Sequence, residues 1–79
     1  MKLLVRNLSR QMTEHEIRVL FTEHGEVSVC NLVLDQETGL SKGFAFVEMP
    51  DAEQAKAAIT ALDQSTVQKS KIRVKLAKN

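Results

Sequence analysis

The sequence predicts an α+β domain whose elements follow one another in the order β-α-β-β-α-β. Short apolar runs rich in β-branched or aromatic residues occur four times, and each indicates a strand. Two segments with apolar residues at helical spacing, each preceded by a capping residue, lie after the first and third of these runs. The 79 residues suffice for one core of two layers.

The first half of the chain contains two predicted strands with one helix between them. Residues 2–6, KLLVR, form the first candidate strand. The helix begins at the T-x-x-E pattern of Thr13 and Glu16, which is typical of a capping box, and Gly25 is suited to ending it. Residues 27–34, VSVCNLVL, are rich in β-branched and apolar residues and indicate the second strand.

The second half repeats this pattern after a polar turn at residues 35–39, whose Gly39 can adopt positive φ. Residues 43–49, GFAFVEM, form the third strand. Asp51 is the expected N-cap of the second helix. Residues 71–76, KIRVKL, alternate between charged and apolar side chains, as a half-exposed strand does.

Short connections of the usual handedness fold this order into a ferredoxin-like sandwich, a four-stranded antiparallel sheet with both helices on one face. No internal repeat, low-complexity stretch or linker interrupts the sequence, so we expect residues 1–79 to form a single domain. The least determined part is residues 64–70, which contain few apolar residues and neither Gly nor Pro to place their turns.

The alternation of the third strand indicates which sheet face the helices cover. Successive side chains point to opposite faces, so Phe44 and Phe46 share a face with Lys42 and Glu48. Charge at both ends of this set directs its face toward water. The opposite set therefore packs beneath the helices: Ala45, Val47 and Met49.

Two adjacent exposed phenylalanines indicate a binding surface, because exposed apolar patches usually mark binding sites. Aromatic rings stack on unpaired bases, and cations hold the phosphates that join those bases, so rings framed by cations suit a single-stranded nucleic acid. The alternation places these cations on the same face: Lys2, Arg6, Lys42, Arg73 and Lys75.

The overall composition of the chain indicates less about its function than the placement of these cations on one face. The net charge of +1 gives almost no support for a nucleic-acid partner, although residues 69–79 contain five basic residues and no acidic one. No apolar run approaches the roughly 20 residues that a membrane span requires, so no membrane association is expected. Cys30 is the only cysteine, which excludes an internal disulfide and fits a reducing compartment.

The third strand also resembles a known motif. Residues 42–49, KGFAFVEM, are similar to RNP1 of the RNA recognition motif (RRM) domain, K/R-G-F/Y-G/A-F-V-x-F/Y, and depart from it only at Met49. Residues 3–8, LLVRNL, resemble the shorter RNP2 motif, and residues 25–47 resemble the middle section of the family almost continuously. The chain is similar to short single-RRM proteins of bacterial type, which implies a cytoplasmic location; whether it is a whole protein or a trimmed domain stays open.

This resemblance implies a non-catalytic protein that binds single-stranded RNA and needs no cofactor. Phe44 and Phe46 match the two stacking rings of RNP1, and Lys42 matches its phosphate contact. Leu4 stands where RNP2 usually has a third ring, so we expect a narrower platform. Asn31, with Val33 on the same face, is placed to read a base edge. The complete set of expected RNA contacts is Lys2, Leu4, Arg6, Asn31, Lys42, Phe44, Phe46, Arg73 and Lys75, with Lys78 as a further position after the last strand.

Other interpretations stay open at this point. A C-terminal segment or a partner protein that covers the two rings would also explain their place on the open face. The main rival function is a protein-interaction module on the same fold. The near-neutral net charge and the leucine at position 4, in place of a third ring, favour it. An enzyme lacks support, because no phosphate loop or nucleophile–base pattern is present. His15 and His24 have no cysteine partners, so no metal site is expected, and Cys30 is interpreted as a small buried hydrophobe. We expect a monomer that also binds single-stranded DNA weakly.

Overall fold

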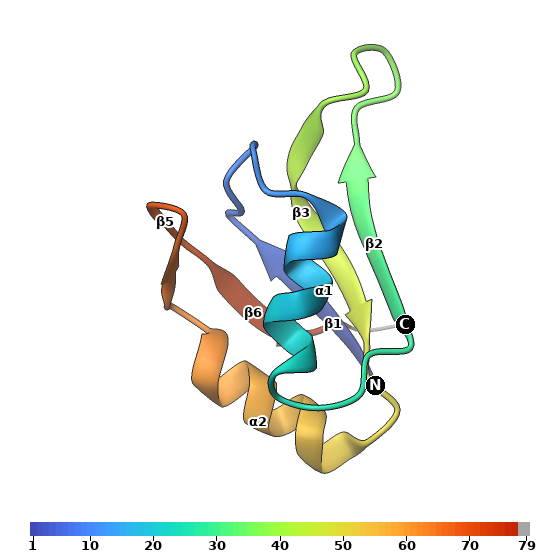
Figure 1. The fold of residues 1–79 in the computed structure, drawn as a ribbon, viewed down its shortest axis with the longest axis vertical. Coiled ribbons are helices and arrows are strands. Elements are labelled where there is room, and N and C mark those ends of the chain that lie inside the picture. Colours follow the sequence, from blue (N-terminus) through green and yellow to red (C-terminus); the bar gives the residue numbers. More distant parts are fainter. Residues whose placement is uncertain (78–79) are drawn as a thin grey trace.

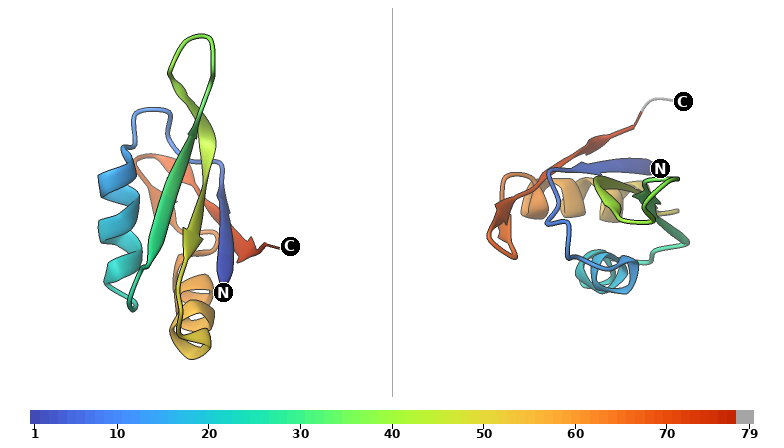
Figure 2. Two further views of the ribbon diagram at one scale, coloured as in Figure 1. Left: turned by 90° about the vertical axis from the view of Figure 1, so that its right-hand side faces the viewer. Right: turned by 90° about the horizontal axis from the view of Figure 1, so that it is seen from above.

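The structure, a computed structural model, describes residues 1–77 and contains the predicted order of elements (Figure 1). Four strands form one antiparallel sheet in the spatial order β2-β3-β1-β6. Their bounds are Lys2–Arg6 for β1, Val29–Leu34 for β2, Ser41–Glu48 for β3 and Arg73–Leu76 for β6. Helices α1, Glu14–Thr22, and α2, Ala52–Leu62, both lie on one side of the sheet (Figure 2), which confirms the predicted sandwich with one open face.

The capping box predicted for α1 is present. The Thr13 hydroxyl oxygen accepts from the Glu16 backbone N–H at 3.2 Å, and the Glu16 carboxylate accepts from the Thr13 backbone N–H at 2.8 Å. The helix ends at Thr22, three residues before Gly25. The two hydrogen bonds of the capping box satisfy backbone donors that the start of a helix leaves free.

Helix α2 begins directly after its predicted N-cap, Asp51. Gln54, three residues after the cap, does not bond back to the Asp51 backbone as a capping box requires. One Asp51 carboxylate oxygen accepts from the backbone N–H groups of Glu53 and Gln54, at 2.8 and 3.1 Å. The Gln54 side chain instead accepts from the Glu26 backbone N–H at 2.9 Å. This bond ties α2 to the loop that precedes β2.

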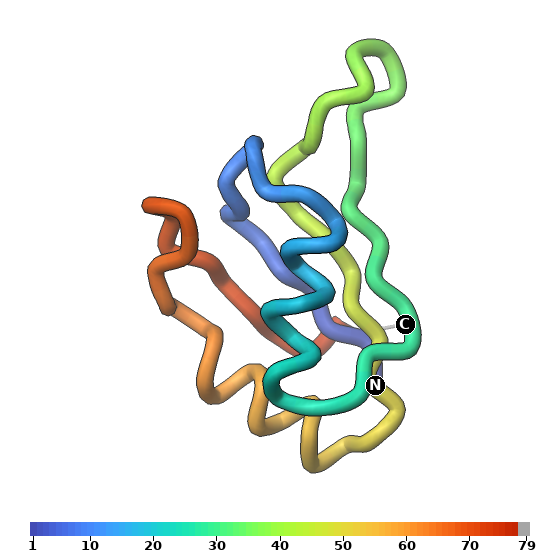
Figure 3. The backbone as a smooth tube through the Cα atoms, viewed as in Figure 1, coloured from blue at the N-terminus to red at the C-terminus, as the bar shows by residue number. Residues whose placement is uncertain are grey.

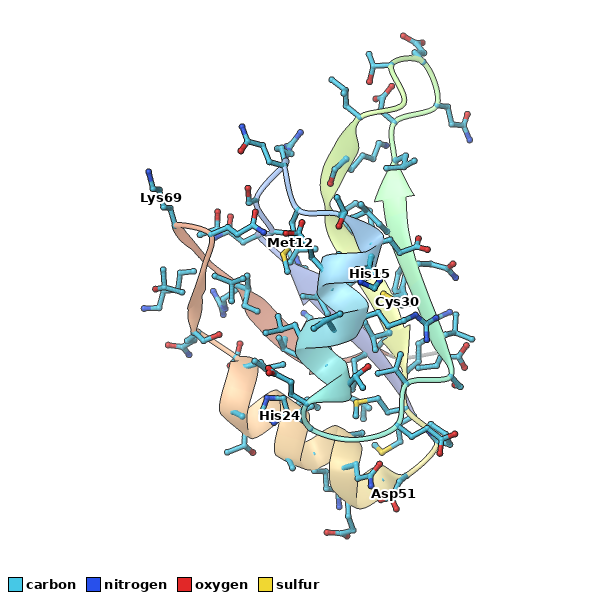
Figure 4. The ribbon with its side chains drawn as sticks, viewed as in Figure 1. Met12, His15, His24, Cys30, Asp51 and Lys69 are labelled. Atoms are coloured by element: carbon cyan, nitrogen blue, oxygen red, sulfur yellow. The ribbon has the colours of Figure 1, made fainter. Side chains whose placement is uncertain are left out.

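The covered sheet face forms the core, as the alternation of β3 predicts. Ala45, Val47 and Met49 are all 0% exposed, and both phenylalanines on the other face are half-buried. Cys30 is also part of this core and lies beside helix α1 (Figure 4). The other large side chains that are fully buried belong to the covered face of the sheet, to α1 and to the residue before β6: Leu3, Val5, Val74, Ile17, Phe21 and Ile72.

The second and fourth predicted strands start later than the sequence indicates. Strand β2 begins at Val29, not at residue 27, and β6 begins at Arg73, not at residue 71. Ser70–Lys71 is a separate strand, β5, which pairs with β4 at Thr66–Val67 in a small hairpin. The predicted single strand over residues 71–76 is therefore wrong at its beginning.

The turn of this hairpin explains why the pattern of residues 64–70 does not reveal it. Gln68 and Lys69 have positive φ, 50° and 69°, in a two-residue turn where Gly or Asn is usual. The Gln68 side-chain amide donates to the Glu16 carboxylate at 3.0 Å, so a distant helix holds the turn. Lys69 lies at its tip, at the edge of the molecule (Figure 4).

The hairpin between β2 and β3 projects beyond the rest of the chain (Figure 3). One Asp35 carboxylate oxygen accepts from the backbone N–H groups of Glu37 and Thr38, at 2.9 and 3.0 Å. The bond from Thr38, followed by that from Glu37, lowers the pKa of Asp35. Gly39 has φ of 75°, so the predicted turn is confirmed.

Candidate nucleic-acid interface

The two phenylalanines of β3 lie at the centre of the open sheet face. Phe46 pairs in register with Leu4 on β1 and with Asn31 on β2. The rings of Phe44 and Phe46 have centroids 6.3 Å apart and planes at 86° to each other, an edge-to-face contact. Asn31 is exposed and Val33 is half-buried, so a polar side chain borders the rings on the β2 side.

Lys2 contacts one of these rings. Its ammonium nitrogen lies 4.9 Å from the centroid of Phe46, which is a cation–π distance. The cross-strand partner of Lys2 is Glu48, but these two side chains form no ion pair in residues 1–77. Lys2 is therefore placed over the aromatic surface and not beside the carboxylate.

A hollow of about 490 Å³ opens at the end of β1, next to β6 and the end of α2. Arg6 and Arg73 are cross-strand partners in it, and like charges in this position repel each other. One Asp63 carboxylate oxygen accepts from the Val74 backbone N–H at 2.9 Å and lies 3.9 Å from Arg73 Nε. The residues that line this hollow are Arg6, Asn7, Asp63, Lys71, Arg73, Val74 and Lys75.

A second hollow of about 280 Å³ lies on the other side of Arg6, beside Phe44. It brings the predicted cations Arg6 and Lys42 together near an aromatic ring, as the sequence predicts. It also contains Arg10, which was not among the predicted site residues. The residues that line it are Arg6, Asn7, Leu8, Arg10, Lys42, Gly43 and Phe44.

The sequence did not indicate that Asn7 lines both hollows, that Arg10 lines the smaller one, or that Lys71 lines the larger one. The Asn7 side-chain amide donates to the Lys71 carbonyl oxygen at 2.7 Å, which joins the end of β1 to β5. Lys71, which is not among the RNA contacts expected from the sequence, lines the larger hollow. One signal was available for Arg10, since antiparallel pairing of β1 with β3 brings the residues after β1 next to Lys42. Lys78 lies outside the described residues.

Residues elsewhere in the fold do not form a second chemical site within residues 1–77. Burial, and then the charge of Glu14, raises the pKa of the Cys30 thiol, so this thiol is a poor nucleophile. His15 and His24 lie near opposite ends of α1 (Figure 4), and no group of three or more potential metal ligands occurs in the described part of the chain. No helix within that part is long and apolar enough to cross a membrane.

Comparisons with known proteins establish the family of this chain. The family model of the RNA recognition motif matches residues 3–73. The chain belongs to the RNA recognition motif family. This RRM chain is 44% identical to RbpD of the bacterium Nostoc sp. strain PCC 7120 over 78 residues, which are 99% of the chain and 83% of RbpD. The predicted resemblance to bacterial-type proteins of this family is confirmed.

Solved structures with the same fold include two whose titles describe bound RNA. RNA Binding Protein PG1 superposes with a TM-score of 0.96 at 37% identity, over 100% of this chain and 95% of that one. The Sxl-lethal protein/RNA complex superposes with a TM-score of 0.94 at 32% identity, over 99% of this chain and 47% of that one. The RRM of Rna15 with bound RNA (GU) has a TM-score of 0.90 at 26% identity, over 99% of this chain and 83% of that one.

Proposed function

We propose that the protein binds single-stranded RNA on its open sheet face, and that residues 1–79 act as one non-catalytic binding domain. The observation that carries this proposal is the pair of half-buried rings on the face that the helices leave open, together with two neighbouring hollows lined by cations, one of which includes Phe44. Family membership supports it, as do two relatives whose titles describe RNA complexes, the Sxl-lethal protein and the Rna15 RRM.

The two rings act as stacking surfaces for two bases. Each base–aromatic stack contributes about 1–3 kcal/mol and tolerates any base. Because the planes of Phe44 and Phe46 are at 86°, two bases stacked on them turn away from each other. Such a geometry suits an unpaired strand, whose successive bases are free to separate. A base that stacks on the face of Phe46 near Lys2 displaces the ammonium group, which is then free to meet a phosphate.

The flanking side chains hold the backbone and read the bases. Arg6, Lys42, Arg73 and Lys75 neutralise phosphates, so binding weakens with salt. Leu4 packs against a base or ribose, and Asn31 offers both a donor and an acceptor to a base edge. Single-stranded DNA binds more weakly, since it lacks the 2′-OH contacts.

The first test is the replacement of both rings. Phe44→Ala and Phe46→Ala are each expected to weaken binding of a short fluorescent single-stranded RNA by about 5- to 150-fold, measured by fluorescence anisotropy. Val19→Ala is a matched control, because Val19 is an exposed apolar residue on α1, behind the sheet. Unchanged affinity in the folded double variant would contradict stacking, and a protein partner for the open face would then be sought.

A further inference from the structure

The smaller hollow contains a cation that the proposed set of RNA contacts does not include. Arg10 belongs to the loop between β1 and α1, and one of its guanidinium N–H groups donates to the Ser41 carbonyl oxygen at 3.3 Å. The same loop is fixed to β3 by the Leu8 backbone N–H, which donates to the Gly43 carbonyl oxygen at 2.9 Å. Arg10 is therefore held at the beginning of β3, next to Lys42 and Phe44.

The absence of a side chain at Gly43 makes room for this guanidinium. Gly43 has φ of 83°, which side-chain-bearing residues rarely adopt. A Cβ at this position would lie 3.0 Å from Arg10 Nε, closer than ordinary van der Waals contact, and 3.4 Å from the Leu8 carbonyl oxygen. The glycine of the RNP1-like motif thus permits the placement of Arg10 in this chain.

Three cations of this hollow lack an ion-pair partner within residues 1–77. Arg6, Arg10 and Lys42 all line it, whereas the single ion pair in that part of the chain is between Arg73 and Asp63. Among the causes that lower the pKa of Asp35, the charge of Lys42 ranks behind the backbone hydrogen bonds from Thr38 and Glu37. Converging like charges repel one another, and an anion in the hollow relieves that repulsion.

We propose that Arg6, Arg10 and Lys42 together bind one phosphate group of the RNA strand, at the nucleotide whose base stacks on Phe44. This inference rests on the proposed function and adds Arg10 to it as a binding residue. The bond to Ser41 uses one of the five N–H donors of Arg10 and leaves the others available for phosphate oxygens. Since this bond positions the side chain before RNA arrives, less conformational entropy is lost on binding.

The test compares two arginines with the same kind of backbone bond on opposite sides of the sheet. Arg18 on α1 donates to the Val27 carbonyl oxygen at 3.2 Å, as Arg10 does to Ser41. Affinity for a short single-stranded RNA is measured from low to moderate salt. Arg10→Gln is expected to weaken low-salt binding at least about tenfold and to reduce the slope of log K against log salt by about 0.7. Arg18→Gln, with the same change in charge, is expected to leave both quantities unchanged.

A conservative variant separates charge from geometry. Arg10→Lys keeps the cation but loses the planar fork, so the salt slope is expected to stay near that of the wild type while affinity falls only partly. Equal behaviour of Arg10→Gln and Arg18→Gln, in a protein whose binding still depends on Phe44, would overturn this inference alone. A wild-type protein that binds no RNA would overturn the proposed function as well. Thermal unfolding midpoints establish that each variant is folded.

Discussion

The two faces of strand β3 differ in a way that side-chain size alone does not explain. The covered face has Ala45 and Val47, with Met49 directly after the strand, all 0% exposed, whereas the open face has two larger phenylalanines that are only half-buried. The helices cover one face, and the smaller side chains lie under them. Lys42 and Glu48, the charged residues on either side of the two phenylalanines on the same face, indicate which face meets water. The hydrophobicity of the rings does not. Changes on the covered face should therefore alter stability, and changes on the open face should alter binding.

The largest expected effect is on the covered face. Met49→Ala leaves a cavity in the core and is expected to reduce the free energy of unfolding by about 2–5 kcal/mol, measured by urea denaturation. The RNA affinity of the folded protein should not change. Phe46→Ala, three positions away on the open face, should have a smaller effect on stability and a larger one on binding. The reverse order of stability losses would contradict the assignment of the two faces.

A ring added to the open face should improve binding. Leu4 pairs in register with Phe46 and Lys75, so Leu4→Phe places a third aromatic surface beside the existing pair. Affinity for single-stranded RNA is expected to rise about fivefold, with little change in stability. Leu3→Phe is the matched control: Leu3 is 0% exposed, and overpacking the core should cost about 1–3 kcal/mol without a gain in affinity. Equal effects of the two variants would show that β1 does not alternate as described.

The smallest expected effect lies behind the sheet. Thr13→Ala removes the N-cap of α1 and should cost about 1 kcal/mol of stability without changing RNA affinity. The backbone hydrogen bond from Thr13, and then its hydroxyl, lower the pKa of Glu16 below its ordinary value of 4.5. Loss of the hydroxyl should raise that pKa part of the way back, measured by carbon-detected NMR titration.

The same variant predicts a pH dependence. A carboxyl group whose folded-state pKa is lowered stabilises the fold above its unfolded pKa and loses that contribution as pH falls through the folded value. The stability difference between wild type and Thr13→Ala should therefore narrow below pH 4.5. A difference that widens in acid would show that the Glu16 carboxylate does not contribute to the cap.

Features that depend on neighbouring residues were predictable. The alternation of residues 42–49 identified the core face and placed the two rings on the open face, and the same residues indicated the family. The capping box of Thr13 and the N-cap Asp51 join groups only two or three residues apart. Short-range patterns of this kind can be interpreted from the sequence because the geometry of a helix or strand sets the distances between near neighbours.

Features that join distant parts of the chain required the folded structure. Gln54 bonds to Glu26 across 28 residues, Arg10 to Ser41 across 31, and Gln68 to Glu16 across 52. Each of these bonds joins residues far apart in the sequence, so no local residue pattern indicates the partner. Such bonds hold the hairpin at residues 66–71 and place Arg10 in the smaller hollow. Their partners come within reach of each other only when the chain is folded.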